Sequence, residues 1–99
     1  MYKVIWRYKV KAEFIKDFLK IYDANGEWVQ LFSKSSDFIK TALFNDVNAD
    51  QYFLTIDYWK SKEAYQNFYK QHHKEIKQID VMGDQMTLLE EKLDEFMSK

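Results

Sequence analysis

Residues 51–65, QYFLTIDYWKSKEAY, decide the fold of this chain. The first nine of them alternate between two faces, and both faces carry large side chains. Alternation with a period of two among aromatic and β-branched residues predicts a β-strand. Ser61 then suits the N-cap of a helix, and Glu63 places an anion in its first turn. The stretch therefore predicts a strand that leads directly into a helix.

Two further strands are predicted upstream of this stretch. Residues 38–47, FIKTALFNDV, also alternate, and the turn-rich segment NDVNAD at 45–50 separates them from the strand at 51–59. This arrangement is typical of an antiparallel hairpin. Residues 2–10, YKVIWRYKV, place Tyr, Val, Trp, Tyr and Val on one face and predict a strand with one strongly apolar face.

The segments between the strands have helical spacing. Apolar residues recur every three or four positions over residues 12–22, and Gly26 then indicates a helix end in the left-handed conformation, followed by a second short helix. The helix after the strand at 51–59 is expected to end before Gly83. Residues 85–93, QMTLLEEKL, suit a helix by propensity, but the topology favours a strand there.

The resulting order, β-α-β-β-α-β with a split first helix, predicts an α+β fold of the ferredoxin-like type in a single domain, residues 1–99. The helices of such a fold cover one face of an antiparallel sheet. The other face would expose several large apolar side chains, so we expect a homodimer that packs sheet against sheet.

Composition excludes several classes of function. The chain has 99 residues, a net charge of -1, no cysteine and one arginine, Arg7. These values argue against disulfides, thiolate catalysis and nucleic-acid binding. The chain has only two glycines, too few for a glycine-rich phosphate-binding loop. No apolar run is long enough to span a membrane, and we expect a cytoplasmic protein.

The sequence resembles a known family. Residues 52–65, YFLTIDYWKSKEAY, are similar to the signature of antibiotic-biosynthesis-monooxygenase-like domains, in which the third strand ends in Trp and Ser/Asp-x-Glu-Ala-aromatic opens the second helix. Residues 4–10, VIWRYKV, resemble the family's first strand, and residues 38–43 its second. The resemblance covers most of the chain and implies a dimeric α/β barrel.

The resemblance implies an oxygenase that uses no cofactor and acts on a small aromatic molecule of the phenol or quinone type. The alternative is a non-catalytic module of the same fold that binds a small molecule or a partner protein. A third reading, haem degradation, would require an Asn on the first strand, where Trp6 and Arg7 stand, and a Trp on the second helix, where Phe68 stands. No metal site is expected.

His72 and Asp57 are the candidate catalytic bases. His72 falls on the helical stripe after Tyr65, and histidine is suited to proton transfer near neutral pH. A packed helix-surface histidine is the alternative. Asp57 lies between apolar strand residues, where burial would raise its pKa. Alternatively, Asp57 forms an ion pair with Arg7 or a lysine on a neighbouring strand.

Aromatic residues are the candidate substrate-binding groups, because pockets are mostly apolar. Such aromatic residues are more often part of the core than ligand contacts, and that is the alternative for each of them. Arg7 is suited to hold a carboxylate or phenolate, or to form a strand salt bridge. The acidic residues at 90–95 are interpreted as a solvated face. The candidate substrate-binding residues are Tyr8, Trp28, Trp59, Arg7 and Phe68.

Overall fold

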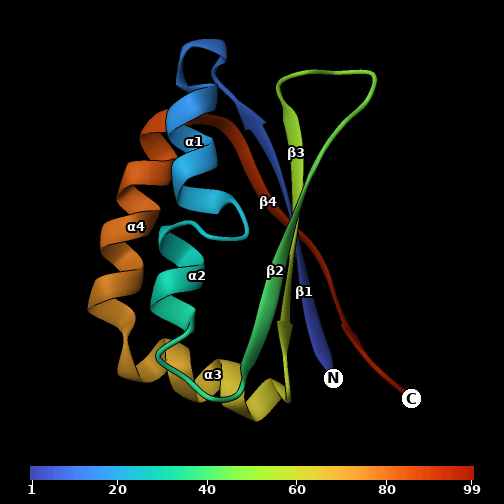
Figure 1. Cartoon of the computed structure of the whole chain (residues 1–99), viewed down its shortest axis with the longest axis vertical. Helices are drawn as coiled ribbons and strands as arrows, with labels where there is room; N and C mark the ends of the chain where they lie inside the picture. Colours follow the sequence, from blue (N-terminus) through green and yellow to red (C-terminus); the bar gives the residue numbers. More distant parts are fainter.

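The computed structural model describes all residues, 1–99, as a four-stranded antiparallel sheet with helices packed on one of its faces (Figure 1). The strands are β1 (Tyr2–Val10), β2 (Phe38–Asn45), β3 (Tyr52–Trp59) and β4 (Thr87–Met97). A 3-10 turn (Ala12–Phe14) leads into α1 (Ile15–Tyr22), followed by α2 (Glu27–Phe32), α3 (Lys62–Gln71) and α4 (His73–Met86). The strand order β2-β3-β1-β4 confirms the ferredoxin-like α+β fold.

The hairpin and the helix start predicted around residues 51–65 are confirmed. β2 and β3 pair antiparallel, and β3 ends at Trp59. The Ser61 hydroxyl accepts a hydrogen bond from the Ala64 amide at 3.1 Å, which satisfies one of the free amides of the first turn of α3. The strand-to-helix connection therefore fixes the direction of α3 against the sheet.

The predicted helix end before Gly83 is wrong. α4 continues through Gly83 to Met86, and β4 begins at Thr87. Gly83 is buried, and a Cβ at this position would overlap the hydroxyl of Tyr22 from α1. The glycine is therefore a site of close packing between α1 and α4 and does not end the helix.

The left-handed conformation predicted for Gly26 is also wrong. Gly26 has a φ of -78° and occupies the N-cap of α2, where a Cβ would clash with the carbonyl of Ile21. A second difference is the break at His72, with a φ of -114°, which divides the predicted second helix into α3 and α4. None of the helices combines the length and the apolar character that crossing a membrane requires.

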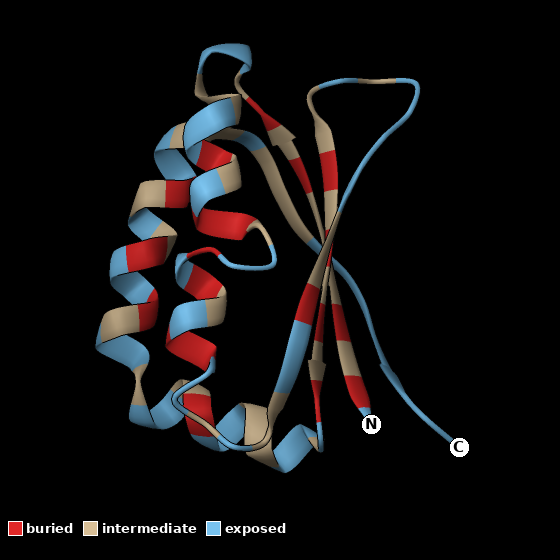
Figure 2. Cartoon of the chain, in the orientation of Figure 1, coloured by how far each residue is buried: buried red, intermediate tan, exposed pale blue.

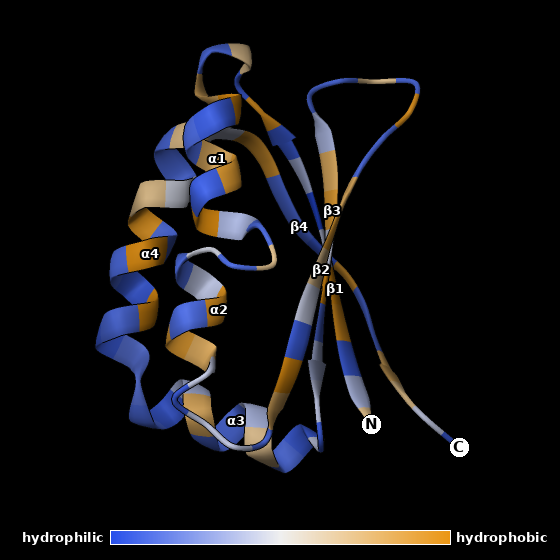
Figure 3. Cartoon of the chain, in the orientation of Figure 1, coloured by the Kyte–Doolittle hydropathy of each residue, from blue (hydrophilic) through white to orange (hydrophobic).

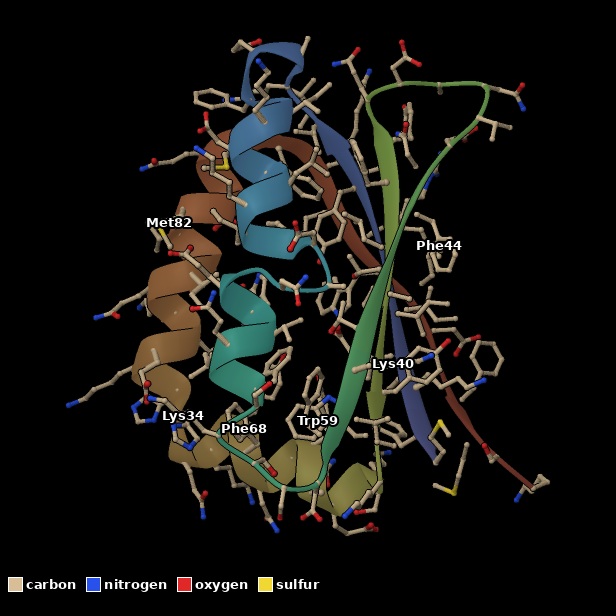
Figure 4. The ribbon with its side chains drawn as sticks, viewed as in Figure 1. Lys34, Lys40, Phe44, Trp59, Phe68 and Met82 are labelled. Carbon is tan, nitrogen blue, oxygen red and sulfur yellow. The ribbon has the colours of Figure 1, made fainter.

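The core is an aromatic layer between the helices and the sheet. Trp59 is fully buried, and its ring centroid lies 5.2 Å from that of Phe32 and 5.3 Å from that of Phe68. Figure 4 shows Trp59 and Phe68 in this layer, whereas Phe44 and Lys40 point away from the helices. In Figure 2 the buried positions of the strands alternate with less buried ones, as expected when helices cover only one face.

The opposite face of the sheet, which we call the open face, is not covered by this chain. Hydrophobic and hydrophilic residues alternate along the strands (Figure 3). At the centre of the open face, Ile56 pairs with Ile5 on one side and with Ala42 on the other. Phe44 is 51% exposed. The open face therefore presents an apolar centre to the surroundings, and the sheet does not close within one chain.

Candidate functional site

A cavity of about 120 Å³ lies between the sheet and the helices, partly open to the surroundings. Its lining comes from all four strands and all four α-helices. The aromatic wall consists of Trp6, Tyr8, Tyr22, Trp28, Phe32 and Tyr69. The polar lining consists of Thr41, Thr55, Asp57, Asp80 and Glu90. An aromatic wall with a few polar groups is typical of a pocket for a small organic molecule.

Asp57 is the most deeply placed charged group of the cavity. It lies on the helix-facing side of β3, and only 7% of it is exposed. The Thr41 hydroxyl from β2 donates a hydrogen bond to Asp57 Oδ1 at 2.6 Å. Burial raises the pKa of Asp57 to about 6, although the hydrogen bond from Thr41 favours the charged form and acts in the opposite direction. At neutral pH Asp57 is thus a carboxylate with a strengthened affinity for a proton.

The alternative ion pair between Asp57 and Arg7 is not formed. Arg7 lies on the open face, where its guanidinium is 3.6 Å from the Glu91 carboxylate and stacks over the ring of Tyr52 at 4.7 Å. The hydrogen-bond partner of Asp57 is the hydroxyl of Thr41 rather than a cation. A buried carboxylate without a paired cation is costly to keep charged, so it readily takes a proton from a neighbouring group.

The tyrosines of the cavity wall cannot serve as the base. Burial raises the pKa of Tyr8, of Tyr22 and of Tyr69 above the ordinary value for a phenol. At neutral pH these hydroxyls therefore stay protonated and act as hydrogen-bond donors or acceptors. The groups of the lining that can remove a proton are the carboxylates.

A second acidic region lies across β1 from Asp57. Glu90 on β4 pairs with Tyr8 of β1, and Asp80 reaches the cavity from α4. Burial, the neighbouring carboxyl of Asp84 and the charge of Asp80 raise the pKa of Glu90 to about 7. Burial and the charge of Asp84 also raise the pKa of Asp80. We call Asp80 and Glu90 the acidic pair of the cavity.

Sequence reasoning missed the acidic pair. Glu90 was expected on a solvated face, but it is half-buried and faces the helices, because β4 shifts register between its pairings with Lys9 and Val10. The strand expected over 85–93 does predict that alternate residues face the helices. Which of the two alternating sets faces the helices depends on the β-bulge in β4, and the sequence does not show this bulge.

Two buried polar atoms of the aromatic wall have no hydrogen-bond partner in the protein. They are the hydroxyl of Tyr22 and the indole N–H of Trp28. Tyr22 is 3% exposed and Trp28 is 9% exposed. Buried polar groups are nearly always paired, by protein or by a bound molecule. The two atoms lie near each other, since the Trp28 N–H lowers the pKa of the Tyr22 phenol, and neither has accessible surface in the cavity.

His72 lies outside the cavity, at the junction of α3 and α4. Its ring stacks on Phe68, and its Nδ1 lies 2.8 Å from a Glu75 carboxylate oxygen. The other oxygen of Glu75 accepts a hydrogen bond from Lys34 at 2.7 Å. Together with Lys34, His72 lines a separate polar groove. The structure therefore does not bring His72 and Asp57 together.

The other predicted site residues divide between the cavity and the core. Tyr8 and Trp28 line the cavity beside Asp57. Trp59 and Phe68 pack in the core below it and are not among its lining residues. Arg7 lies on the open face. Thr41, which holds Asp57, and Trp6 are lining residues that sequence reasoning did not select.

The donor set of the cavity suits an organic ligand rather than a metal ion. No group of three or more His, Asp or Glu side chains is arranged to hold a metal. The cavity instead combines a proton acceptor, Asp57, with an aromatic wall. Such an arrangement can hold one aromatic ring and remove a proton from it.

Comparison with known proteins gives a consistent family and fold. The family model described as antibiotic biosynthesis monooxygenase matches residues 1–78. SnoaB, a cofactor-independent oxygenase from Streptomyces nogalater, is similar in structure with a TM-score of 0.74 and 16% identity over 99% of this chain and 92% of that chain. A conserved protein from Methanosarcina mazei Go1 has a TM-score of 0.74 and 14% identity over the same shares, 99% and 92%. No curated protein sequence matches the chain.

Proposed function

Because the chain belongs to the antibiotic biosynthesis monooxygenase family, we propose that it is a cofactor-independent oxygenase of a small, electron-rich phenol, with Asp57 as the base. The observation that carries this proposal is the buried Asp57 carboxylate in an aromatic cavity, held by Thr41 at 2.6 Å and without a paired cation. A base with a pKa of about 6 is ionised at neutral pH and still accepts a proton readily.

The proposed reaction consumes one O2 for each phenol. Asp57 removes the phenol proton, and the phenolate passes one electron to O2. The resulting radical pair combines, which forms a C–O bond at the ring carbon ortho or para to the oxygen. Loss of the hydrogen from that carbon and cleavage of the O–O bond give a quinone and one water. One oxygen atom of O2 enters the product, the other leaves as water, and all four electrons come from the substrate.

The size of the cavity limits the substrate. Its volume of about 120 Å³ is close to that of an engineered apolar cavity of about 150 Å³ that holds one benzene molecule. Room for one ring is therefore expected, with substituents extending toward the partly open end. The protonated tyrosines of the wall support the proposal, because they can orient the substrate oxygen without competing with Asp57 for its proton.

The test is oxygen consumption with a panel of monocyclic phenols and hydroquinones, without added flavin, nicotinamide or metal. We expect one O2 consumed per quinone formed, and activity that rises with pH through a value of about 6, as Asp57 ionises. Asp57→Asn should lower kcat/KM by about 100-fold or more, the usual effect of removing a general base. Asp17→Asn, the same change on the exposed side of α1, is the matched control.

His72→Ala completes the experiment, since His72 is the other candidate base. Loss of turnover in His72→Ala with full turnover in Asp57→Asn would transfer the role of base to His72 and refute our assignment. Binding of phenols without any O2 consumption would support the alternative, a non-catalytic module that binds a small aromatic molecule.

A further inference from the structure

The charge of the cavity lining is entirely negative. The lining contains the carboxylates of Asp57, Asp80 and Glu90, and it contains no Lys, Arg or His. Lys92, two residues beyond Glu90 on β4, forms an ion pair with Glu95 at 3.2 Å instead. The third acidic residue on α4, Asp84, also lies close enough to affect Glu90. An anionic ligand would therefore be repelled, whereas a cationic one would relieve the repulsion among these groups.

The two acidic regions lie at opposite ends of a diagonal across the sheet. Asp57 on β3 is level with Val4 of β1, while Glu90 on β4 is level with Tyr8 of β1. The strand β1 lies between β3 and β4 and contributes Trp6 and Tyr8 to the floor of the cavity. A ring placed on this floor would have Asp57 near one end and the acidic pair near the other.

Tyr22 of the aromatic wall lies beside the acidic pair. Tyr22 is 3% exposed, and the nearby Trp28 N–H lowers the pKa of its hydroxyl, although the two do not form a hydrogen bond of good geometry. Tyr22 packs against Gly83 of α4. The Tyr22 phenol is close enough to Glu90, Asp80 and Asp84 for their charges to raise its pKa, so the carboxylates and this part of the aromatic wall lie at one end of the cavity.

The aromatic wall also suits a cation. Trp28 and Tyr22 have ring centroids 6.3 Å apart, and both line the cavity. The faces of Trp and Tyr rings attract ammonium groups, most strongly where water is excluded. The carboxylates of the acidic pair and the indole of Trp28 thus belong to the lining of one cavity.

We propose that the cavity selects a phenol that carries an amine, with the hydroxyl directed to Asp57 and the ammonium group bound by Asp80 and Glu90. This inference rests on the proposed function for the placement of the phenol and adds the class of substrate. It excludes phenols that carry a carboxylate, since no cation of the cavity lining can bind one.

The test uses three probes with the same phenol ring and different charges: tyramine, which is cationic, tyrosol, which is neutral, and 4-hydroxyphenylacetate, which is anionic. Their dissociation constants are measured by isothermal titration calorimetry at about pH 8, where Asp57 and Glu90 are ionised and the amine is protonated. We expect tyramine to bind at least about tenfold more tightly than tyrosol, which corresponds to one charge-assisted contact. 4-Hydroxyphenylacetate should bind most weakly.

Glu90→Gln keeps the size of the side chain and removes its charge. It should reduce the preference for tyramine over tyrosol by about tenfold and leave the affinity for tyrosol unchanged. Glu91→Gln is the matched control. Glu91 is next to Glu90 in the sequence, but it lies on the open face and forms an ion pair with Arg7. Its preference for tyramine should equal that of the unchanged protein.

The outcomes separate the two proposals. Equal affinity for tyramine and tyrosol, or tightest binding of 4-hydroxyphenylacetate, would overturn the selection of amines while leaving a phenol-binding cavity. A preference that persists in Glu90→Gln would overturn the role of Glu90. If none of the three probes bound, the phenol-binding cavity itself would be refuted, and the selection of amines with it.

Discussion

At the scale of single residues, the burial of Asp57 has a consequence for stability. Its pKa is raised from 3.8 to about 6 in the folded protein, first by desolvation and against the opposing effect of Thr41. Between about pH 4 and pH 6 the folded chain therefore binds more protons than the unfolded chain. The free energy of unfolding must then fall as pH rises through this window, and the contribution levels off above it.

We predict that Asp57→Asn removes this pH dependence. A pKa difference of about two corresponds to about 3 kcal/mol, so the unfolding free energy of the variant relative to the unchanged protein should rise by about 2–3 kcal/mol between pH 4 and pH 7. Urea denaturation at several pH values measures this difference. Glu90 titrates in both proteins and cancels in the comparison.

Asp17→Asn provides the reference for this measurement. Asp17 is exposed on α1, so its replacement should give a difference in unfolding free energy that does not change with pH. If the difference for Asp57→Asn were equally constant between pH 4 and pH 7, then Asp57 would not be a buried carboxylate with a raised pKa, and its assignment as the base would lose its physical support.

At the scale of secondary-structure elements, the packing of α1 on α4 depends on Gly83. An alanine there would overlap the Tyr22 hydroxyl, whose ring is held in a stack with Phe18 at 4.2 Å. We predict that Gly83→Ala destabilises the fold by about 1–3 kcal/mol, the usual cost of overpacking. The measurement is the free energy of unfolding in urea.

The same change should become neutral or stabilising when Tyr22 is replaced by Phe. The Tyr22 hydroxyl lies near the Trp28 N–H but forms no hydrogen bond of good geometry, so Tyr22→Phe alone should cost little. Without the hydroxyl, the higher helix propensity of alanine over glycine, about 1 kcal/mol, can be realised in α4. An equal cost of Gly83→Ala in both backgrounds would show that the close contact with Tyr22 is not the reason for the glycine.

This contact also shows what the sequence could not predict about the elements. Alternation located β1 and β3 to within a residue, because strand periodicity is a local property. The continuation of α4 through Gly83 was missed, because it depends on Tyr22, a residue that is distant in sequence. Local signals mark a glycine as unusual, but only the packing tells whether it ends a helix or admits a neighbour.

The candidate site, too, could be predicted only where local periodicity determines the position of a residue. Asp57, Tyr8 and Trp28 were selected from their strand or helix positions, and all three line the cavity. Glu90 was assigned to the solvated side, because the bulge in β4 that turns it toward the helices leaves no pattern in the sequence. In the sequence, His72 continues the helical stripe that faces inward. In the structure, however, the helix breaks at His72, between α3 and α4.

At the scale of the whole molecule, the open face has no cover within the chain. Its centre is apolar: Ile56 lies between Ile5 and Ala42, and Leu54 pairs with Phe44. Charged side chains such as Lys3, which lies over the ring of Tyr58, surround this centre. An apolar centre with a polar rim is the usual arrangement of an interface between subunits.

We therefore predict a symmetric homodimer that packs the open faces of two sheets together. Light scattering coupled to size-exclusion chromatography should give about 24 kDa, twice the 12.1 kDa of one chain. Ile56→Lys places a charge at the centre of the open face and should yield a monomer. Because the dimer would bury this face, Ile56→Lys should also abolish the increase of the melting temperature with protein concentration.

Val81→Lys is the matched control for the dimer, since it makes the same kind of change on α4, where Val81 is 49% exposed on the helical side of the molecule. It should leave the mass at twice that of one chain. A 12 kDa species for the unchanged protein, or equal dissociation by both variants, would contradict the sheet-to-sheet interface.

If the prediction holds, the interface lies on the face of the sheet opposite the cavity, because Asp57 and Ile56 are neighbours on β3 and point to opposite sides. Ile56→Lys therefore separates the subunits without changing a residue of the cavity lining. Loss of the partner can still lower the stability of the sheet that carries Asp57. Oxygen consumption by the monomer would then measure how far the site depends on the second subunit.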